Sequence, residues 1–297
     1  MKPISLEGCF PPIATPFDEQ GAVHHEQLMR NIEKWQKTPL RGFAVLGSNG
    51  EAVFLEEAEK LAVWETARNA IDADHIFIAG TGCESTRATL NLTQKAAQCG
   101  ADAALVVTPH YYKGKMTHEA LMHHYTPVAD HSPIPLILYN VPAFTGVDLT
   151  AETIIALSMH PHIIGLKESS GNVVKMGAVC AAAPSHFQVL AGSGSFLLPA
   201  LTVGAVGGIM ALASVAPYQV NDIIRLFKDG SLEEAREIQL KLIDANAAVT
   251  SRFGIPGLKA AMELIHMYGG PVRSPLLPLN EVQRESLKKI LMEAGII

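Results

Sequence analysis

The sequence predicts a (β/α)8 barrel, or TIM barrel, followed by a C-terminal helical extension. Short apolar runs rich in β-branched residues recur along the chain, and amphipathic stretches lie between them. Most successive runs begin roughly 25–35 residues apart, which is the length of one strand–helix unit and implies parallel strands joined by crossover helices. Eight such units match a barrel of this class, which typically has about 250 residues.

The predicted strands share an apolar centre and a polar or glycine-containing end. They cover residues 8–17, 42–48, 75–82, 103–109, 135–142, 163–170, 187–194 and 204–214. The runner-up architecture is an open doubly wound sheet. Eight near-equal units without a dinucleotide-binding fingerprint favour the closed barrel over this alternative.

The stretches between the predicted strands have the periodicity of amphipathic helices. In residues 24–37, Leu28, Ile32 and Trp35 follow one another at spacings of three and four, so they share one face of a helix. The same spacing recurs in residues 55–71. These segments are therefore predicted to be the helices that cover the barrel.

The later helices complete the predicted architecture. Residues 85–101 open on Ser85, a suitable helix cap, and end at Gly100, a normal helix stop. The barrel should close near residue 217, and the remaining residues, 218–297, have helical patterns. We therefore expect a catalytic barrel domain of residues 1–217, with the extension packed on it rather than forming a second catalytic domain.

Composition excludes several classes of partner. The chain has 297 residues and a formal net charge of −6, and it has no basic run interleaved with aromatic residues, which argues against a nucleic-acid partner. Glycines and prolines interrupt the longest apolar stretch, so no membrane span is expected. The four cysteines are far apart without a CxxC pair, as in a reducing compartment. With no apparent targeting segment at the N-terminus, the prediction is a cytoplasmic protein.

Several cofactor motifs can be set aside. HEALMHH (residues 118–124) lacks the HExxH spacing of a helical zinc site, and we expect it to lie on a solvated helix face. GTGCES and GSGSFL each lack the third glycine of a dinucleotide fingerprint, and the chain contains no GxxxxGK[ST] motif. The sequence therefore predicts neither a metal nor a nucleotide cofactor.

The stretch HPHIIGLKESSGN (residues 160–172) carries a buried-looking strand into a charged end. Lys167 follows the apolar run directly, although an ammonium group is almost never fully buried unless it is paired or used. The simplest interpretation is that Lys167 is the first solvated residue after the strand. Active-site groups of a barrel, however, lie at the C-terminal ends of the strands. Lys167 is the only lysine or arginine at a predicted strand end, among hydroxyls and glycines, which favours a nucleophile.

A lysine in this setting indicates imine chemistry. Burial disfavours a charged amine, and a neutral amine attacks a ketone; the protonated Schiff base that results is an electron sink. Tyr139 ends the neighbouring strand and could shuttle a proton, or it could be a packed rim residue. Ser48 and Tyr111 could extend the relay, and either could equally be structural. GSNGE (residues 47–51) could present N–H groups to a carboxylate, although a plain strand-to-helix turn would have the same pattern.

Six motifs then point to a known family. They are PPIATPF, GSNGE, TPHYY, YNVP, GLKESSGN and LAGSG. In their order and near their spacings, they resemble the dihydrodipicolinate synthase and N-acetylneuraminate lyase family of Schiff-base aldolases over essentially the whole chain. Other segments resemble most the 4-hydroxy-2-oxoglutarate aldolases of the mitochondrial type. These segments are RGFAVLGSNGE, GTGCEST, HHYTPVADHSPIP, FQVLAGS, NAAVTSRFGIPGLK and YGGPVRSPL.

The resemblance implies roles for individual residues. It makes Lys167 the Schiff-base lysine, Tyr139 the general acid/base, and Ser48 and Tyr111 the rest of the proton relay. In this family the tyrosine at the Tyr111 position is typically contributed across a subunit interface, and the family is usually a homotetramer built from dimers. Ser48 and Asn49 would hold the pyruvyl carboxylate. The resemblance also places three residues along the pocket, namely Ser169, Gly192 and Ile209.

One departure from the family pattern bears on the substrate. Dihydrodipicolinate synthases carry an arginine shortly after YNVP, where it holds the carboxylate of the aldehyde substrate, whereas YNVPAFTG places Phe144 there. The predicted reaction is therefore cleavage of 4-hydroxy-2-oxoglutarate to pyruvate and glyoxylate. The alternatives are condensation of pyruvate with aspartate semialdehyde, as in 4-hydroxy-tetrahydrodipicolinate (dihydrodipicolinate) synthase, another 2-oxo acid lyase reaction, and a non-catalytic barrel that senses a 2-oxo acid.

Overall fold

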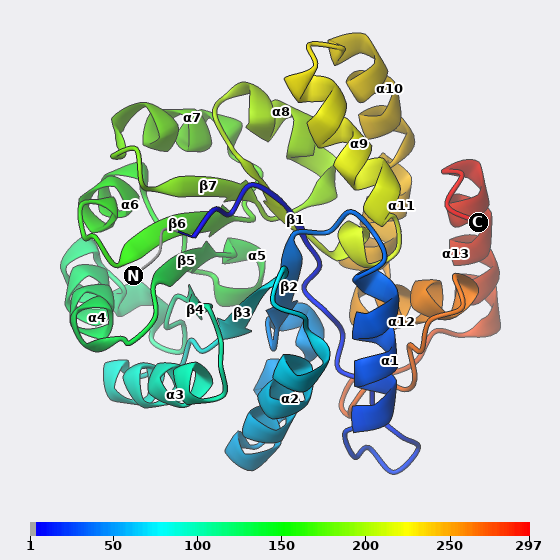
Figure 1. Cartoon of the computed structure of the whole chain (residues 1–297), viewed down its shortest axis with the longest axis horizontal. Helices are drawn as coiled ribbons and strands as arrows, with labels where there is room; N and C mark the ends of the chain where they lie inside the picture. Colours follow the sequence, from blue (N-terminus) through cyan, green and yellow to red (C-terminus); the bar gives the residue numbers. More distant parts are fainter. Residues whose placement is uncertain (1–3) are drawn as a thin grey trace.

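The computed structural model describes residues 4–297 and contains one eight-stranded parallel sheet (Figure 1). Its strands are β1 (Gly8–Phe10), β2 (Gly42–Val45), β3 (Ile76–Gly80), β4 (Ala103–Val107), β5 (Leu136–Asn140), β6 (Ile163–Glu168), β7 (Gln188–Ala191) and β8 (Gly207–Ile209). Neighbours in space run in the order β1-β8-β7-β6-β5-β4-β3-β2. This order is that of a barrel, and the predicted fold class is confirmed.

The barrel closes between β1 and β2 through a short contact rather than a full ladder. The one bridge in this seam joins Pro12 to Ala44, and the Ala44 N–H donates to the Pro11 carbonyl at 3.0 Å. The Ile13 N–H donates in turn to the Ala44 carbonyl at 3.0 Å. Two successive prolines have no N–H groups to donate, so a regular ladder cannot continue here.

Helices surround the strands and continue beyond the last one. The α-helices are α1 (His25–Trp35), α2 (Glu57–Ala70), α3 (Thr86–Gln98), α4 (His118–His131), α5 (Pro142–Thr145), α6 (Ala151–Ser158), α7 (Val173–Ala182), α8 (Leu197–Thr202), α9 (Pro217–Lys228), α10 (Leu232–Lys241), α11 (Ile243–Ala247), α12 (Gly254–Leu264) and α13 (Glu281–Glu293). The short helical turns are η1 (Ser48–Gly50), η2 (Ala52–Phe54), η3 (Lys113–Lys115), η4 (Gly194–Phe196), η5 (Ala211–Ser214) and η6 (Ala248–Arg252). Within residues 4–297, no helix is both long enough and apolar enough to cross a membrane.

Every predicted strand is present, but each ends earlier than predicted. The difference is greatest for two predicted strands. Of residues 8–17, only the three residues of β1 pair in the sheet, and of residues 204–214, only the three residues of β8 do so. The predicted strand end at Ser214 is wrong, because residues 211–214 form the turn η5. An apolar run marks burial, and these residues are buried in a turn below α9 rather than in a strand.

The strands separate two apolar clusters. One fills the barrel interior and includes Phe10, Ile78, Ile137 and Ile209. The other, larger cluster lies between the barrel and its helices and takes the alternate strand residues, such as Leu138. Successive side chains of a strand point to opposite faces, so membership of a cluster shows which face each residue occupies.

A bulge in β6 changes which of its residues face the interior. Leu136 pairs with Ile163, but Ile137 pairs with Gly165, so β6 has one extra residue at this point. An ideal Cβ on Gly165 would lie 2.5 Å from the Gln188 carbonyl oxygen, which leaves room only for glycine. The shift reverses the alternation of all later β6 residues, as a one-residue slip does.

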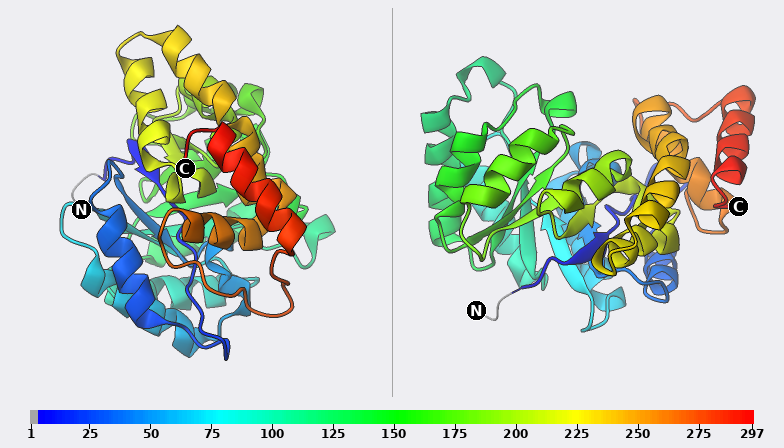
Figure 2. Two further views of the ribbon diagram at one scale, coloured as in Figure 1. Left: turned by 90° about the vertical axis from the view of Figure 1, so that its right-hand side faces the viewer. Right: turned by 90° about the horizontal axis from the view of Figure 1, so that it is seen from above.

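The helices after β8 gather on one side of the barrel, beside α1, as Figure 1 shows. Helix α13 forms the outer surface of that side in Figure 2. Helix α9 packs against β1 and α8 and so lies in the ring of helices around the strands. The division into a barrel domain of residues 1–217 and an extension of residues 218–297 remains our proposal.

The expectation of a solvated face for residues 118–124 is wrong for His124. This side chain is buried where α4 packs against α3, and its Nδ1 lies 3.1 Å from Thr86 Oγ1. Burial lowers the pKa of His124 to about 4. His123, one position earlier, is exposed. The helix–helix contact therefore holds a buried histidine, while the residue before it faces solvent.

We expect Gly165→Ala to destabilise the fold by about 1–3 kcal/mol, the usual cost of overpacking a core. The added methyl group would meet a backbone carbonyl that belongs to the sheet and cannot move aside. Gly177→Ala, in α7, is the matched control, because its nearest neighbour would be Val203 Cβ at an ordinary 3.5 Å. Urea unfolding should show a loss for the first variant and none for the second. Equal stability of the two variants would contradict the role of the bulge.

Candidate active site

Two buried residues meet at the carboxyl ends of β5 and β6. Tyr139 and Lys167 are partners in the strand register; Tyr139 faces the barrel interior, and the bulge in β6 turns Lys167 to the same side. The Lys167 side chain is only 2% exposed, and its Nζ lies 4.0 Å from the centroid of the Tyr139 ring. The lysine is therefore not a solvated strand end.

Lys167 differs from the other buried lysines in having no carboxylate partner. Buried Lys175 and Lys259 each form ion pairs, whereas among residues 4–297 no ion pair is found for Lys167. A buried amine without a counter-charge is costly unless it is used in its neutral form. This contrast indicates that the Lys167 amine is available to react with a ligand.

Ser48 extends the line of groups from the amine. Its Oγ lies 3.2 Å from the Tyr139 hydroxyl oxygen, so Lys167, Tyr139 and Ser48 form one continuous set. Ser48 and Asn49 belong to η1, between two residues with left-handed backbone, Leu46 (φ 60°) and Glu51 (φ 54°). Such strain in non-glycine residues persists only where the surroundings hold it in place.

Part of that support comes from the far end of the chain. Lys259, on α12, lies 2.7 Å from a Glu51 carboxylate oxygen, and the Arg273 N–H donates to the other oxygen at 2.8 Å. Burial lowers the pKa of Lys259, and its pairing with Glu51 opposes that shift. The Arg273 side chain is held in turn by Glu59. Sequence reasoning missed this support, because no local pattern connects residues so far apart.

The other predicted pocket residues have separate positions. Asn49 is half-buried on η1, and Ile209 ends β8 inside the barrel. The Ser169 hydroxyl is buried and has no hydrogen-bond partner among residues 4–297. It lies so close to Gly192 that a Cβ there would be 1.9 Å from Ser169 Oγ. A buried free hydroxyl next to a glycine leaves a polar position for a ligand.

Two aromatic residues of interest lie outside this set. Tyr111 is 77% exposed and packs edge-on against Tyr112, so one subunit does not bring it to Tyr139. Phe144, on α5, is 73% exposed and offers neither charge nor hydrogen-bond donor. Its position next to the strand end that carries Tyr139 makes it a candidate for contact with the distal part of a substrate.

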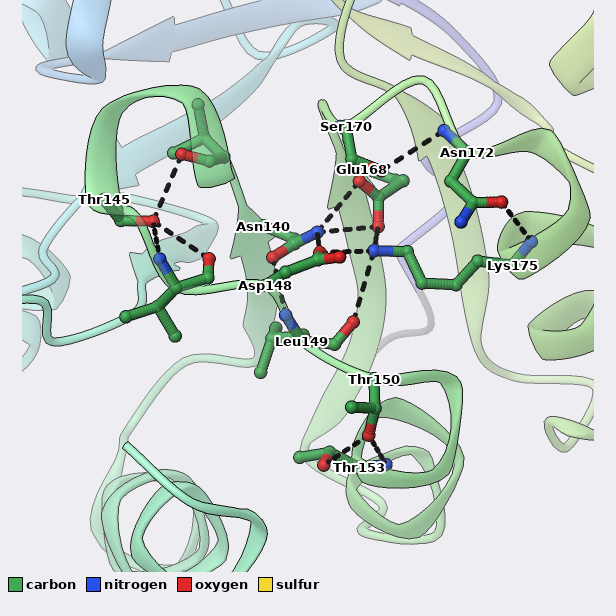
Figure 3. A network of polar contacts seen from close by, with 12 residues as sticks. Asn140, Thr145, Asp148, Leu149, Thr150, Thr153, Glu168, Ser170, Asn172 and Lys175 are labelled. Atoms are coloured by element: carbon green, nitrogen blue, oxygen red, sulfur yellow. Dashed lines mark hydrogen bonds and ion pairs between the residues drawn. The ribbon is translucent and has the colours of Figure 1, made fainter. Parts of the chain in front are cut away.

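Sequence reasoning also missed a polar network behind the reactive pair. Asn140 and Glu168, the next residues of β5 and β6, point to the opposite face and bind Asp148 and Lys175 (Figure 3). The signal was present in the alternation of the strand, because a residue that follows an inward-facing lysine must face outward.

The arrangement can form and use an imine. A neutral amine at the strand end can attack a carbonyl carbon, a phenol beside it can carry protons, and the η1 turn can receive an anionic group. Among the described residues, no group of three or more His, Cys, Asp or Glu side chains is placed to hold a metal ion.

A barrel whose strand ends hold a buried, unpaired lysine against a tyrosine defines a class of enzymes that make or break carbon–carbon bonds beside a carbonyl group. The family model for the Dihydrodipicolinate synthetase family matches residues 5–294, and the chain belongs to this family. It is therefore an enzyme of the pyruvate-dependent carbon–carbon lyases and synthases.

Relatives match over nearly the whole chain. A 4-hydroxy-tetrahydrodipicolinate synthase from Methanothrix thermoacetophila is 34% identical over 287 residues, which is 96% of each protein. A dihydrodipicolinate synthase from Bacillus anthracis has a TM-score of 0.94 at 28% identity and covers 97% of this chain and 98% of its own. The chloride-inhibited synthase from Acinetobacter baumannii, complexed with pyruvate, has a TM-score of 0.93 at 32% identity and covers 99% and 100%.

These comparisons confirm the family predicted from the motifs. The curated relative named above is a synthase, so its name supports the alternative reaction rather than the 4-hydroxy-2-oxoglutarate aldolase subtype. That subtype stays a prediction from the sequence.

Proposed function

We propose that the protein is a class I aldolase that cleaves 4-hydroxy-2-oxoglutarate to pyruvate and glyoxylate through an imine on Lys167. The observation that carries the proposal is the line from the unpaired Lys167 amine, past the Tyr139 ring, to the Ser48 hydroxyl. The proposed reaction uses no cofactor.

The reaction begins at the substrate ketone. The neutral Lys167 amine attacks C2, and loss of water from the carbinolamine gives a protonated imine. Tyr139 supplies the proton that leaves with this water, and the phenolate so formed takes the proton of the C4 hydroxyl group while the C3–C4 bond breaks. The bonding electrons move to the iminium nitrogen, so glyoxylate leaves and an enamine remains. Protonation of the enamine at C3 and hydrolysis of the imine release pyruvate and restore the lysine.

The remaining residues would hold the substrate. Ser48 and Asn49 receive the pyruvyl carboxylate at η1, a turn that Lys259 and Arg273 support through Glu51. The unpartnered Ser169 hydroxyl, beside Gly192, offers a hydrogen bond, while Ile209 closes the apolar side.

The second candidate is condensation of pyruvate with aspartate semialdehyde, the reaction of 4-hydroxy-tetrahydrodipicolinate synthase. The names of the relatives favour it. Phe144 disfavours it, because the exposed phenyl ring cannot pair with the carboxylate of a second, separately bound aldehyde. A substrate already attached to Lys167 has less need of such a contact.

Tyr111 can take part only if another subunit brings it to the site. Its exposed ring, beside Tyr112, is consistent with a tyrosine supplied across an interface. We therefore propose a homotetramer built from dimers in which Tyr111 joins the relay of a partner subunit. The cytoplasmic location stays a prediction from the sequence.

Incubation with pyruvate and borohydride should add a reduced pyruvyl group to Lys167 alone. The two other buried lysines, Lys175 and Lys259, are engaged in ion pairs with carboxylates and should stay unlabelled, which makes them internal controls. Peptide mass spectrometry identifies the labelled residue. Labelling that persists in Lys167→Ala would rule out the imine assignment.

Tyr139→Phe should lower kcat by roughly 10²–10⁴-fold, the span expected for a positioned general acid/base. The ring that packs against Lys167 is kept, so the change removes only the hydroxyl that contacts Ser48. Imine trapping with pyruvate should survive better than cleavage, because water can serve carbinolamine formation. Turnover close to that of the wild type would show that Tyr139 only packs.

Glyoxylate release should exceed condensation with aspartate semialdehyde in kcat/KM. Without an arginine at Phe144, the anionic aldehyde loses a charged hydrogen bond worth about 1.5–3 kcal/mol. That loss corresponds to roughly 10–150-fold in affinity. Phe144→Arg should raise condensation relative to cleavage. If the native enzyme condenses tenfold faster than it cleaves, the synthase assignment replaces ours.

A further inference from the structure

We infer that Lys175 is a positioning residue, which acts through Glu168 and Asn140 to fix the reactive pair Lys167 and Tyr139 relative to each other. The inference rests on the proposed function, because it concerns the geometry of the same imine-forming pair. Lys175 itself lies behind the sheet and does not face the barrel interior.

The network lies one residue beyond the reactive pair. Tyr139 is paired with Lys167 in the sheet, and Asn140 is paired with Glu168 in the next register position. Because side chains alternate, the first pair faces the interior and the second faces α7. Any sliding of β5 against β6 would therefore disturb both pairs together.

Glu168 is the centre of the network in Figure 3. Its carboxylate is completely buried and accepts bonds from the Asn140 amide, at 2.9 Å to each oxygen, and from the Ser170 N–H at 2.6 Å. The Lys175 Nζ lies 3.0 Å from Oε2. Side chains thus join β5 to β6 directly behind the reactive residues, in addition to the backbone ladder.

Asn140 is fixed from its other side as well. Its Oδ1 accepts the Leu149 N–H at 2.9 Å, and its Nδ2 donates to Asp148 at 2.7 Å. Lys175 closes the circuit, because its Nζ donates to Asp148 at 2.5 Å and to the Leu149 carbonyl at 3.2 Å. The loop after α5 therefore contacts β5 directly through Asn140 and reaches β6 through the Lys175 ammonium group.

The start of α7 fixes Lys175 in turn. The Asn172 side chain caps this helix by accepting the Lys175 N–H at 2.9 Å. Lys175 is 8% exposed and lies in the first turn of the helix, so its ammonium group has little freedom to leave the site. Removing it would leave the Glu168 carboxylate buried without a cation, which is unfavourable, and the strand ends would rearrange.

The test compares three variants in the full chain. Lys175→Met removes the ammonium group, Lys175→Arg restores a cation, and Asp148→Asn removes a half-exposed charge without burying an unpaired one. Tyr125→Phe is the stability control, since it removes a buried hydrogen bond to the Val106 carbonyl, between α4 and β4. Urea unfolding, pyruvate trapping and the kinetics of glyoxylate release are measured for each.

Lys175→Met should lower kcat by about 10–100-fold, because small displacements of reacting groups are that costly. KM should stay within about threefold of the wild-type value, since the η1 turn proposed to receive the carboxylate follows β2 and not β5 or β6. Asp148→Asn should keep the fold even if Lys175→Met does not, and it should lower kcat by about threefold or more. Lys175→Arg should recover part of the kcat that Lys175→Met loses. Tyr125→Phe should lose stability with unchanged kcat.

Two results separate the possible failures. If the wild-type protein traps no pyruvate on Lys167, the proposed function is wrong. If it does, but Lys175→Met and Asp148→Asn keep the wild-type kcat, or lose it only in proportion to the unfolded fraction, the positioning role is overturned while the proposed function stands.

Discussion

The pairing of β5 with β6 is the constraint on which the site depends. One extra residue in β6, accommodated at Gly165, determines which face of the sheet each later residue of β6 occupies. With this extra residue, Lys167 faces the interior beside Tyr139, and Glu168 faces α7. Without it, the amine would lie among the helices and the carboxylate would enter the barrel. A single backbone irregularity, at a position with room only for glycine, thus decides which of two neighbouring charged residues faces the barrel interior.

The three buried lysines show how the surroundings assign different roles to one side chain. Lys175 and Lys259 lie against carboxylates, and each acts as a cross-link. Lys259 also lies over the Phe17 ring, whereas Lys167 has the Tyr139 ring beside it but no ion pair among residues 4–297. A ring face attracts a cation more weakly than a carboxylate does, and it leaves the amine free to react once neutral. The absence of a counter-charge is therefore as important to the proposed chemistry as the presence of the amine.

Much of this site could be predicted from sequence, because strand ends in a barrel converge at one rim. The residues Lys167, Tyr139 and Ser48 were found in this way, and the structure brings them together. The supports were not found. Alternation places Glu168 on the face opposite Lys167, but an apolar run does not reveal the bulge that decides which of the two faces the interior. Local patterns likewise gave strand limits that are too long, because they record burial and not hydrogen bonding.

Two separate supports meet at the contact between Ser48 and Tyr139. Helix α7 and the loop after α5 fix β5 and β6, and with them the phenol and the amine. The C-terminal extension fixes the η1 turn, because Lys259 and Arg273 bind the carboxylate of Glu51 directly after it. The proposed reaction needs a fixed distance between the site for the substrate carboxylate and the Lys167 amine. The carboxylate site is the η1 turn after β2, and the amine is on β6, and these two strands are not neighbours in the sheet. The barrel fixes this distance only if the ends of β2 and β6 are themselves held in place. The extension supplies this second restraint, because Lys259 and Arg273 bind the turn after β2 through Glu51.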